Sequence, residues 1–202
     1  GSMAVKLAEE NIDELKTKQI LLIGTGEVST LVAKSLQRRG YAFNVTSRTI
    51  GRSETFCETM GGNPIKFEEV LSGFNKYDVI FVATTAPYFL VTQERITDAM
   101  KDKDNGMMIL DLSNPRTVDE KVATIGGVKL MNLDQIAEMV EKNMNARLNK
   151  VKTVENIIRE EVSVLEASMK RLDAEPLVTD VFKSIENLRE KELNKALQML
   201  DE

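Results

Sequence analysis

The stretch that most constrains this chain is a glycine-containing turn between an apolar run and an amphipathic segment. The run covers residues 20–23, the turn is Gly24-Thr25-Gly26, and apolar residues then recur at helical spacing at Leu31, Val32, Ala33 and Leu36. This order predicts a strand, a tight turn and a helix. Gly24 permits a sharp reversal, Gly26 lets a ligand approach the backbone, and the helix offers N–H groups to an anion. We therefore expect a diphosphate site at Gly24, Thr25, Gly26, Glu27 and Val28.

The turn alone is equally compatible with an ordinary connection between a strand and a helix. Ser29 stands at the third small position, where the dinucleotide pattern usually has Gly or Ala. The rest of the chain must therefore decide between the two interpretations.

The pattern of alternating elements supports nucleotide binding. Further strand-like runs occur at residues 41–46, 65–67, 78–83, 107–112 and 128–131, with helical patterns between them at 51–60, 68–74, 93–100 and 118–123. Strands that alternate with helices imply right-handed crossovers and a parallel sheet. We expect an α/β fold, a doubly wound, Rossmann-like sheet of order 3-2-1-4-5-6. Its ligand crevice lies at the carboxyl ends of the first and fourth strands.

The end of the second predicted strand bears on the choice of cofactor. A site for NAD normally places Asp or Glu about 20 residues beyond the glycines, to bind the ribose 2′-hydroxyl. Here the residues are Ser47, Arg48 and Thr49, with Arg52 one turn later and no acid among them. Hydroxyls and guanidinium groups suit a 2′-phosphate, which predicts NADPH. The alternative is that both arginines are ordinary solvated surface cations.

Two more predicted loops overhang the same crevice. Thr84, Thr85, Ala86 and Pro87 follow the fourth strand, and Ser113 and Pro115 follow the fifth. Small and hydroxylated side chains there suit the nicotinamide and its ribose, and the prolines stiffen the backbone. Plain turns at strand ends are the alternative.

The composition excludes several classes of site. The chain of 202 residues has no His and one Cys, so His-based acid–base chemistry, an internal disulfide and the usual zinc sites are excluded. Cys57 lies on a predicted helix and is expected to be structural, and Asp78 and Asp111 border strands, where they either organise backbone or face the crevice. No apolar run approaches the about 20 residues that span a bilayer, and we expect a cytoplasmic protein. The net charge of -5 offers no global basic field for nucleic acid.

Beyond residue 133 the pattern becomes entirely helical. Apolar residues step by threes and fours from Ile136 through Leu148, Val162 and Leu165 to Leu172, and Pro176 suits the first turn of a second helix that begins after Ala174, with Glu175 near its positive end. The apolar face of that second helix continues to Leu200. The two helices expose more apolar surface than one hairpin buries, which favours dimerisation. A monomeric hairpin folded on the first domain is the alternative.

Together these motifs resemble the glutamyl-tRNA reductase family in its archaeal form. The resemblance is carried, in chain order, by QILLIGTGEVS, SRT followed by Arg52 and Phe56, GG at 61 and 62, DVIFVATTAP, ILDLSNPR, VKLMNLDQI, EKN with Arg147, ENIIREE and LREKELNKAL. Members of this family use NADPH to reduce glutamyl-tRNA to glutamate-1-semialdehyde for tetrapyrrole and heme biosynthesis. A cysteine thiolate attacks the ester, and hydride from NADPH reduces the resulting thioester.

The resemblance implies a division of labour. In the family, the nucleophilic Cys and a neighbouring His belong to an N-terminal domain that this chain does not contain. Residues 1–15 would be the end of an interdomain helix, with residues 1–3 a tag remnant. Residues 16–132 would be the NADPH-binding domain, and residues 133–202 an incomplete helical linker and dimerisation segment. We expect NADPH as cofactor, a homodimer through the C-terminal helices, weak binding of glutamyl-tRNA, and neither a catalytic residue nor a metal site.

Three residues depart mildly from the family pattern: Ser29, Ser47 and Asn114. Two other functions stay open. One is a complete small NADP-dependent dehydrogenase of the shikimate-dehydrogenase or siroheme type, although no substrate domain with a Lys-Asp pair is evident. The other is a non-catalytic nucleotide-binding scaffold, which would differ in showing self-association that depends on NADPH.

Overall fold

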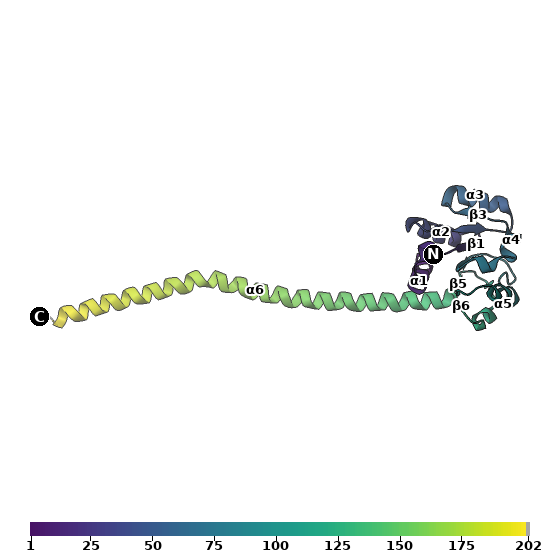
Figure 1. Ribbon diagram of the computed structural model, residues 1–202. Coiled ribbons are helices and arrows are strands. Elements are labelled where there is room, and N and C mark those ends of the chain that lie inside the picture. The colour runs from purple at the N-terminus through teal and green to yellow at the C-terminus, as the bar shows by residue number, and fades with distance from the viewer. Residues whose placement is uncertain (201–202) are drawn as a thin grey trace. The chain divides into compact units, whose positions relative to one another are not determined.

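The fold is built on a six-stranded parallel sheet (Figure 1). The computed structural model describes residues 1–200, without the side chains of 143, 145–147, 149, 171–175 and 198–200. The strands are β1 Ile20–Ile23, β2 Asn44–Thr46, β3 Asn63–Pro64, β4 Val79–Val82, β5 Met107–Asp111 and β6 Val128–Asn132. Their order is β3-β2-β1-β4-β5-β6, which confirms the predicted doubly wound topology. β1, β4 and β5 are buried along their whole length, as their unbroken apolar sequences indicate.

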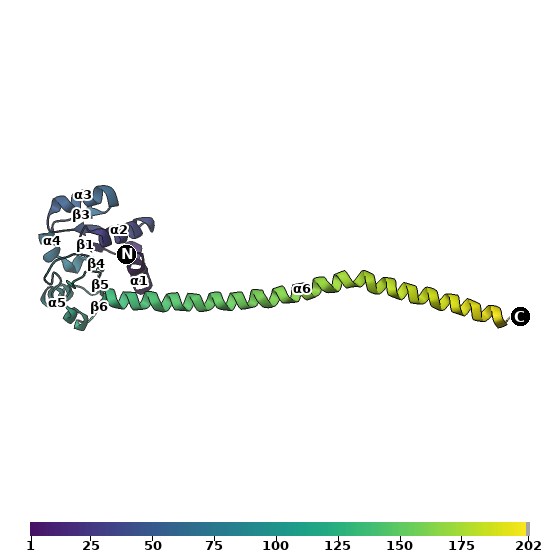
Figure 2. The same ribbon diagram turned by 180° about the vertical axis from the view of Figure 1, so that it is seen from behind.

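Helices cover both faces of the sheet. α1 Ser2–Asn11, α2 Glu27–Arg38 and α3 Ile50–Met60 contribute to the apolar cluster on one face. α4 Phe67–Leu71, α5 Gln93–Lys101 and the short 3-10 helices η2 Phe74–Lys76 and η3 Glu120–Thr124 contribute to the cluster on the other. Figures 1 and 2 show α1 and α2 on the side of the sheet opposite α4 and α5. A further 3-10 helix, η1 Leu15–Thr17, precedes β1. The carboxyl ends of β1 and β4 therefore meet at one edge between the two layers.

The bounds of several elements differ from the sequence prediction. The third strand is Asn63–Pro64 and not residues 65–67. The N–H of Asn63 donates to the carbonyl oxygen of Phe43, just before β2, and the N–H of Ile65 donates to that of Val45 within β2, so the pairing is centred on Pro64. Pro64 is tolerated since β3 is the edge strand. The helix expected at 118–123 is the 3-10 helix η3, and α1 ends at Asn11 where residue 15 was expected. None of these shifts changes the order of the sheet.

The C-terminal helical region differs from the sequence prediction more than these elements do. Two helices were predicted with Pro176 opening the second, but α6 Leu133–Leu200 is continuous and contains Pro176 in its interior. A proline within a helix removes one backbone hydrogen bond and commonly bends the helix without ending it. The predictions that concern the side chains of Arg147, Leu172, Ala174, Glu175 and Leu200 lie outside the described residues.

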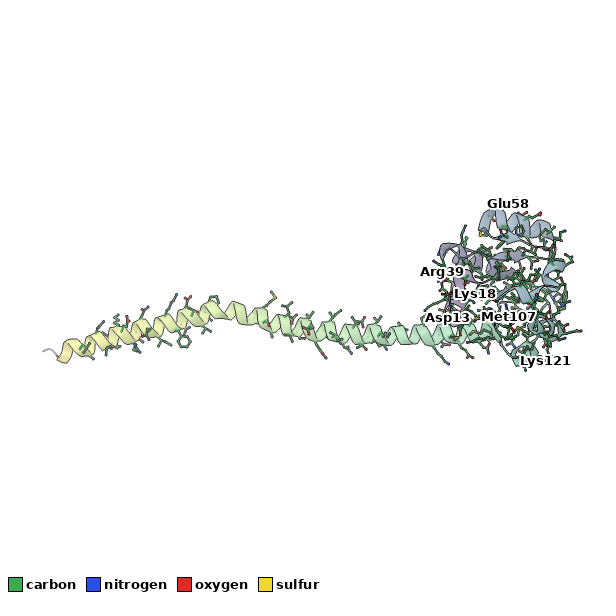
Figure 3. All side chains as sticks on the ribbon, viewed as in Figure 1. Asp13, Lys18, Arg39, Glu58, Met107 and Lys121 are labelled. Carbon is green, nitrogen blue, oxygen red and sulfur yellow. The ribbon has the colours of Figure 1, made fainter. Side chains whose placement is uncertain are left out.

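The chain divides into two compact units, Gly1–Lys142 and Asn143–Glu202. In the first unit, the start of α6 is held by a reciprocal cap, in which Asn132 N–H donates to Gln135 Oε1 (2.9 Å) and Gln135 N–H donates to Asn132 Oδ1 (3.0 Å). In the second unit the apolar stripe is exposed at Met144, Leu148, Val151, Val154, Ile158, Val162, Leu165 and Met169. Figure 3 shows the described side chains along α6. Among the described residues, none of the helices combines the length and the apolar character of a membrane span.

Candidate nucleotide site

A large cavity of the first unit lies at the carboxyl ends of β1, β2 and β4. Its volume is about 890 Å³. Residues from the turn after β1, the start of α3 and the loop after β4 line it. Among the residues that the structure describes, the lining includes two arginines and several hydroxyl side chains, and no carboxylate. This is the crevice at which doubly wound sheets bind their ligands.

The glycine turn forms the floor between the two sides of the cavity. Gly24 has a φ of +116°, and a Cβ built on it would lie 2.0 Å from the carbonyl oxygen of Ala83. Its N–H donates to the carbonyl oxygen of Thr46 over 2.8 Å, so the turn joins β1 to both neighbouring strands. Only glycine fits this position, because it combines a left-handed backbone with a close approach to β4.

Gly26 plays a different part in the same turn. It is the N-cap residue of α2, no side chain caps that helix, and a Cβ built on it would meet no atom within 4 Å. The space above it therefore faces uncapped N–H groups at the positive end of a helix of 12 residues. A diphosphate fits this position on steric and electrostatic grounds.

Ser29, which stands where the dinucleotide pattern usually has Gly or Ala, is fully buried. Its Oγ donates to the carbonyl oxygen of Ala83 over 3.2 Å. The hydroxyl thus ties α2 to the end of β4 at the point where Gly24 also approaches it. The departure preserves the close packing of helix and strand that the nucleotide turn requires.

The β2 side of the cavity carries its positive charge. Arg48 and Arg52 are exposed and line the cavity, and neither forms an ion pair with a carboxylate among the described residues. Ser47 also lines the cavity, and its Oγ donates to the carbonyl oxygen of Thr49 over 2.9 Å. Thr49 itself is the N-cap residue of α3 and lies outside the lining. The two guanidinium groups are therefore free to bind an anion.

The β4 side is neutral. Thr84, Thr85 and Ala86 line the cavity, whereas Pro87 does not. Ser113 and Pro115 also lie outside the lining, although Ser113 accepts a hydrogen bond from the N–H of Thr84 over 3.2 Å. Glu27 and Val28 are exposed on the first turn of α2 and do not line the cavity either. The structure thus brings nine of the fifteen predicted residues together around one space.

Several lining residues were missed by the sequence interpretation. They lie on α3, at the start of α4 and in the loop after β4: Gly51, Thr55, Phe56, Thr59, Phe67, Tyr88 and Leu90. Thr55 and Thr59 could have been found, because they follow Arg52 by three and seven positions and share its helix face. Tyr88 carries no comparable local signal.

Cys57 and the acidic residues offer no alternative centre. Cys57 is half-buried, lies outside the cavity lining, and its thiol has a pKa raised by burial, which favours the unreactive protonated form. Within the described residues, no group of three or more His, Cys, Asp or Glu side chains could hold a metal ion.

A smaller cavity of about 340 Å³ lies at the amino ends of the strands, where Asp13, Lys18 and Met107 line it (Figure 3).

The fold and the cavity together define a nucleotide-binding α/β protein. Residues 6–139 match the family described as Shikimate / quinate 5-dehydrogenase, and this chain belongs to that family. A dehydrogenase family supports a nicotinamide nucleotide as the class of cofactor. Residues 153–202 match a second family, described as Glutamyl-tRNAGlu reductase, dimerisation domain.

The similarities to individual proteins are more specific. The chain is 65% identical over 200 residues to the glutamyl-tRNA reductase of Cenarchaeum symbiosum, which covers 99% of this chain and 48% of that protein. The solved glutamyl-tRNA reductase of Methanopyrus kandleri superposes with a TM-score of 0.71 at 34% identity, over 98% of this chain and 50% of that one. The nucleotide-binding domain of the Thermoplasma volcanium enzyme has the same fold, with a TM-score of 0.56 at 24% identity, over 72% of this chain and 94% of that one.

These similarities confirm the resemblance to archaeal glutamyl-tRNA reductases over nearly the whole chain. The chain spans about half the length of the curated relatives it matches.

Proposed function

We propose that this chain binds NADPH and acts as the hydride-donor part of a glutamyl-tRNA reductase, in the synthesis of tetrapyrroles. The observation that carries the proposal is the lining of the large cavity, which holds Arg48, Arg52 and no carboxylate from the described part of the chain. An acid at this position would favour the ribose 2′-hydroxyl of NADH, whereas arginines favour the 2′-phosphate of NADPH. The dehydrogenase family match supports the same class of cofactor.

The residues present fit such a cofactor along its whole length. Arg48, Arg52 and Ser47 would hold the 2′-phosphate, and the uncapped start of α2 above Gly26 would hold the diphosphate. Thr84 and Thr85 would orient the nicotinamide and its ribose. NADPH supplies a hydride when bound, and the role of this chain is to bind and aim it.

The remaining chemistry is proposed to lie outside this chain. Among the described residues, the cavity lining offers hydroxyls but no cysteine or carboxylate, and burial raises the pKa of the Cys57 thiol. An attack on the glutamyl ester needs an activated nucleophile. We therefore assign that step to the half of the relatives that this chain does not cover, together with the recognition of glutamyl-tRNA.

The C-terminal part is proposed to join two copies of the chain. Residues 16–132 would form the NADPH domain and residues 133–202 the linker and dimerisation segment, with residues 1–15 belonging to an interdomain helix. The match of residues 153–202 to a dimerisation domain supports this division. The exposed apolar stripe on α6 is the surface that a second copy would cover. We place the protein in the cytoplasm, where the aminoacyl-tRNA substrate is made.

The proposal is tested by titrating the chain with NADPH and following nicotinamide fluorescence. Saturable binding is expected. In parallel, the chain is incubated with glutamyl-tRNA and NADPH, and the absorbance of NADPH should stay constant. Oxidation of NADPH by this chain alone would contradict the assignment of the nucleophile to another part of the protein, and the absence of binding would contradict the proposal as a whole.

A further inference from the structure

Asp111, at the carboxyl end of β5, is the centre of a buried hydrogen-bond network behind the cavity. Its side chain is 2% exposed. Oδ2 accepts the N–H groups of Thr117 (2.9 Å) and Val118 (3.0 Å), and Oδ1 accepts the N–H of Ser113 (3.0 Å). Three backbone donors thus occupy the carboxyl group, so Asp111 organises backbone and does not face the crevice as an acid or base.

The side chains of Ser113 and Thr117 connect the Asp111 network to the loop after β4. Thr117 Oγ1 donates to Ser113 Oγ over 2.9 Å, and Ser113 Oγ accepts the N–H of Thr84 over 3.2 Å. Both hydroxyl side chains are buried, at 0% and 5% exposure for Thr117 and Ser113. The first residue of the cavity loop that follows Ala83 is therefore fixed by the loop after β5.

The other end of the same cavity loop is held by the backbone of Thr117 and Val118. The N–H of Leu90 donates to the carbonyl oxygen of Thr117 over 2.8 Å, and Val91 pairs with Val118 in a parallel bridge. The loop from Thr84 to Leu90 is thus anchored at both ends to the backbone that Asp111 holds. Five residues of this loop line the cavity: Thr84, Thr85, Ala86, Tyr88 and Leu90.

We propose that Asp111 is a positioning residue, which sets the geometry of the β4 side of the cavity without touching the ligand. This inference rests on the proposed function, in which that side receives the nicotinamide. The β2 side is built independently, from Arg48 in the loop after β2, from Arg52 in the first turn of α3 and from the hydrogen bonds of Ser47. Loss of the Asp111 network therefore weakens binding of the nicotinamide half of the cofactor and spares the adenosine half.

Asp111→Asn tests this inference. The amide cannot accept hydrogen bonds at both of its ends, so either Ser113 or the pair Thr117 and Val118 loses its acceptor. Dissociation constants are measured by calorimetry for NADPH and for adenosine 2′,5′-bisphosphate, which lacks the nicotinamide half. We expect NADPH to bind about tenfold more weakly and the adenosine bisphosphate to change by less than about twofold.

Two further variants make the result decisive. Ser113→Ala removes only the acceptor for Thr84, and should shift the same ratio by a few-fold even if Asp111→Asn does not fold. Asp78→Asn makes the same substitution at the amino end of β4, where Lys103 and Gln19 are its partners, and should leave the ratio of the two constants unchanged.

An equal loss for both ligands, or no loss for either, in folded Asp111→Asn and Ser113→Ala would overturn the positioning role. Failure of the wild-type chain to bind NADPH would instead overturn the proposed function.

Discussion

Gly24 approaches Ala83 so closely that a Cβ on Gly24 would lie 2.0 Å from the Ala83 carbonyl oxygen. The same oxygen accepts a hydrogen bond from Ser29. The first turn of the nucleotide site is therefore packed against β4 from two directions. Gly26, two residues later, has open space where its Cβ would stand. The two glycines thus serve different purposes, which substitutions can separate.

Gly24→Ala should destabilise the fold, whereas Gly26→Ala should mainly weaken binding. Gly24→Ala introduces a steric clash and forces alanine into a left-handed backbone conformation, which should lower the free energy of unfolding by about 3 kcal/mol. The second costs about 1 kcal/mol at most in unfolding, but its methyl group stands where the diphosphate is proposed to lie, and NADPH should bind about tenfold more weakly. Urea unfolding and NADPH titration of both variants check the contrast. Equal effects of the two variants on unfolding and on binding would contradict the distinction.

Arg48→Ala with Arg52→Ala should erode the preference for NADPH over NADH. Each guanidinium is proposed to donate charge-assisted hydrogen bonds to the 2′-phosphate, worth about 1.5–3 kcal/mol each. The ratio of the two dissociation constants should therefore fall by about tenfold or more. Arg38→Ala is the matched control, because Arg38 is an exposed cation at the end of α2, outside the cavity lining. An unchanged ratio in the double variant would refute the role of the two arginines.

Asp78 should make the free energy of unfolding measurably dependent on pH. Burial acts to raise its pKa, but the hydrogen bonds from Lys103 and Gln19 and the charges of Lys103 and Lys18 together hold the pKa below its ordinary value of 3.8. The ionised group thus stabilises the fold above pH 3.8, and this contribution is lost as the pH falls from there through the lowered pKa.

Asp78→Asn leaves the nearly buried Lys103 ammonium unpaired, which should cost about 3 kcal/mol at neutral pH. The difference in unfolding free energy between this variant and the wild-type chain should narrow below pH 3.8. Urea unfolding across a pH series measures it. A difference that stays constant or widens on acidification would show that the ion pair does not carry the stabilisation.

Leu165→Asp should convert the proposed dimer to a monomer. Leu165 is exposed in the middle of the apolar stripe of α6, and a carboxylate there cannot be buried against a second copy without a large desolvation penalty. Light scattering after size-exclusion chromatography measures the molar mass. Ser163→Asp is the control, because residue 163 lies on the opposite helix face, two positions away. Identical masses for wild type, variant and control would argue against dimerisation through this stripe.

Most of the fold could be predicted from the sequence, because its signals are local. The apolar runs at β1, β4 and β5 are strands buried on both faces, and their alternation with helices was enough to order the sheet. The errors fell where local signals conflict with tertiary context. β3 is only two residues long and contains Pro64, so it has no strand pattern of its own. At Pro176, the signal for the start of a second helix was outweighed by the strongly helical sequence on both sides.

The lining of the cavity was predictable where backbone chemistry demands a residue type, and not where packing decides. Gly24 and Gly26 follow from the turn, and Arg48 from the end of β2. Tyr88 reaches the lining through the path of a loop that the sequence does not specify. Ser113 was assigned to the lining because it follows a strand, but its hydroxyl accepts the Thr84 N–H and lies behind the cavity.

We propose that the cavity of this chain selects NADPH over NADH. This claim is tested most directly by isothermal titration of the wild-type chain with NADPH and with NADH under identical conditions. The structure predicts that NADPH binds at least about tenfold more tightly. Equal dissociation constants, or tighter binding of NADH, would contradict the account.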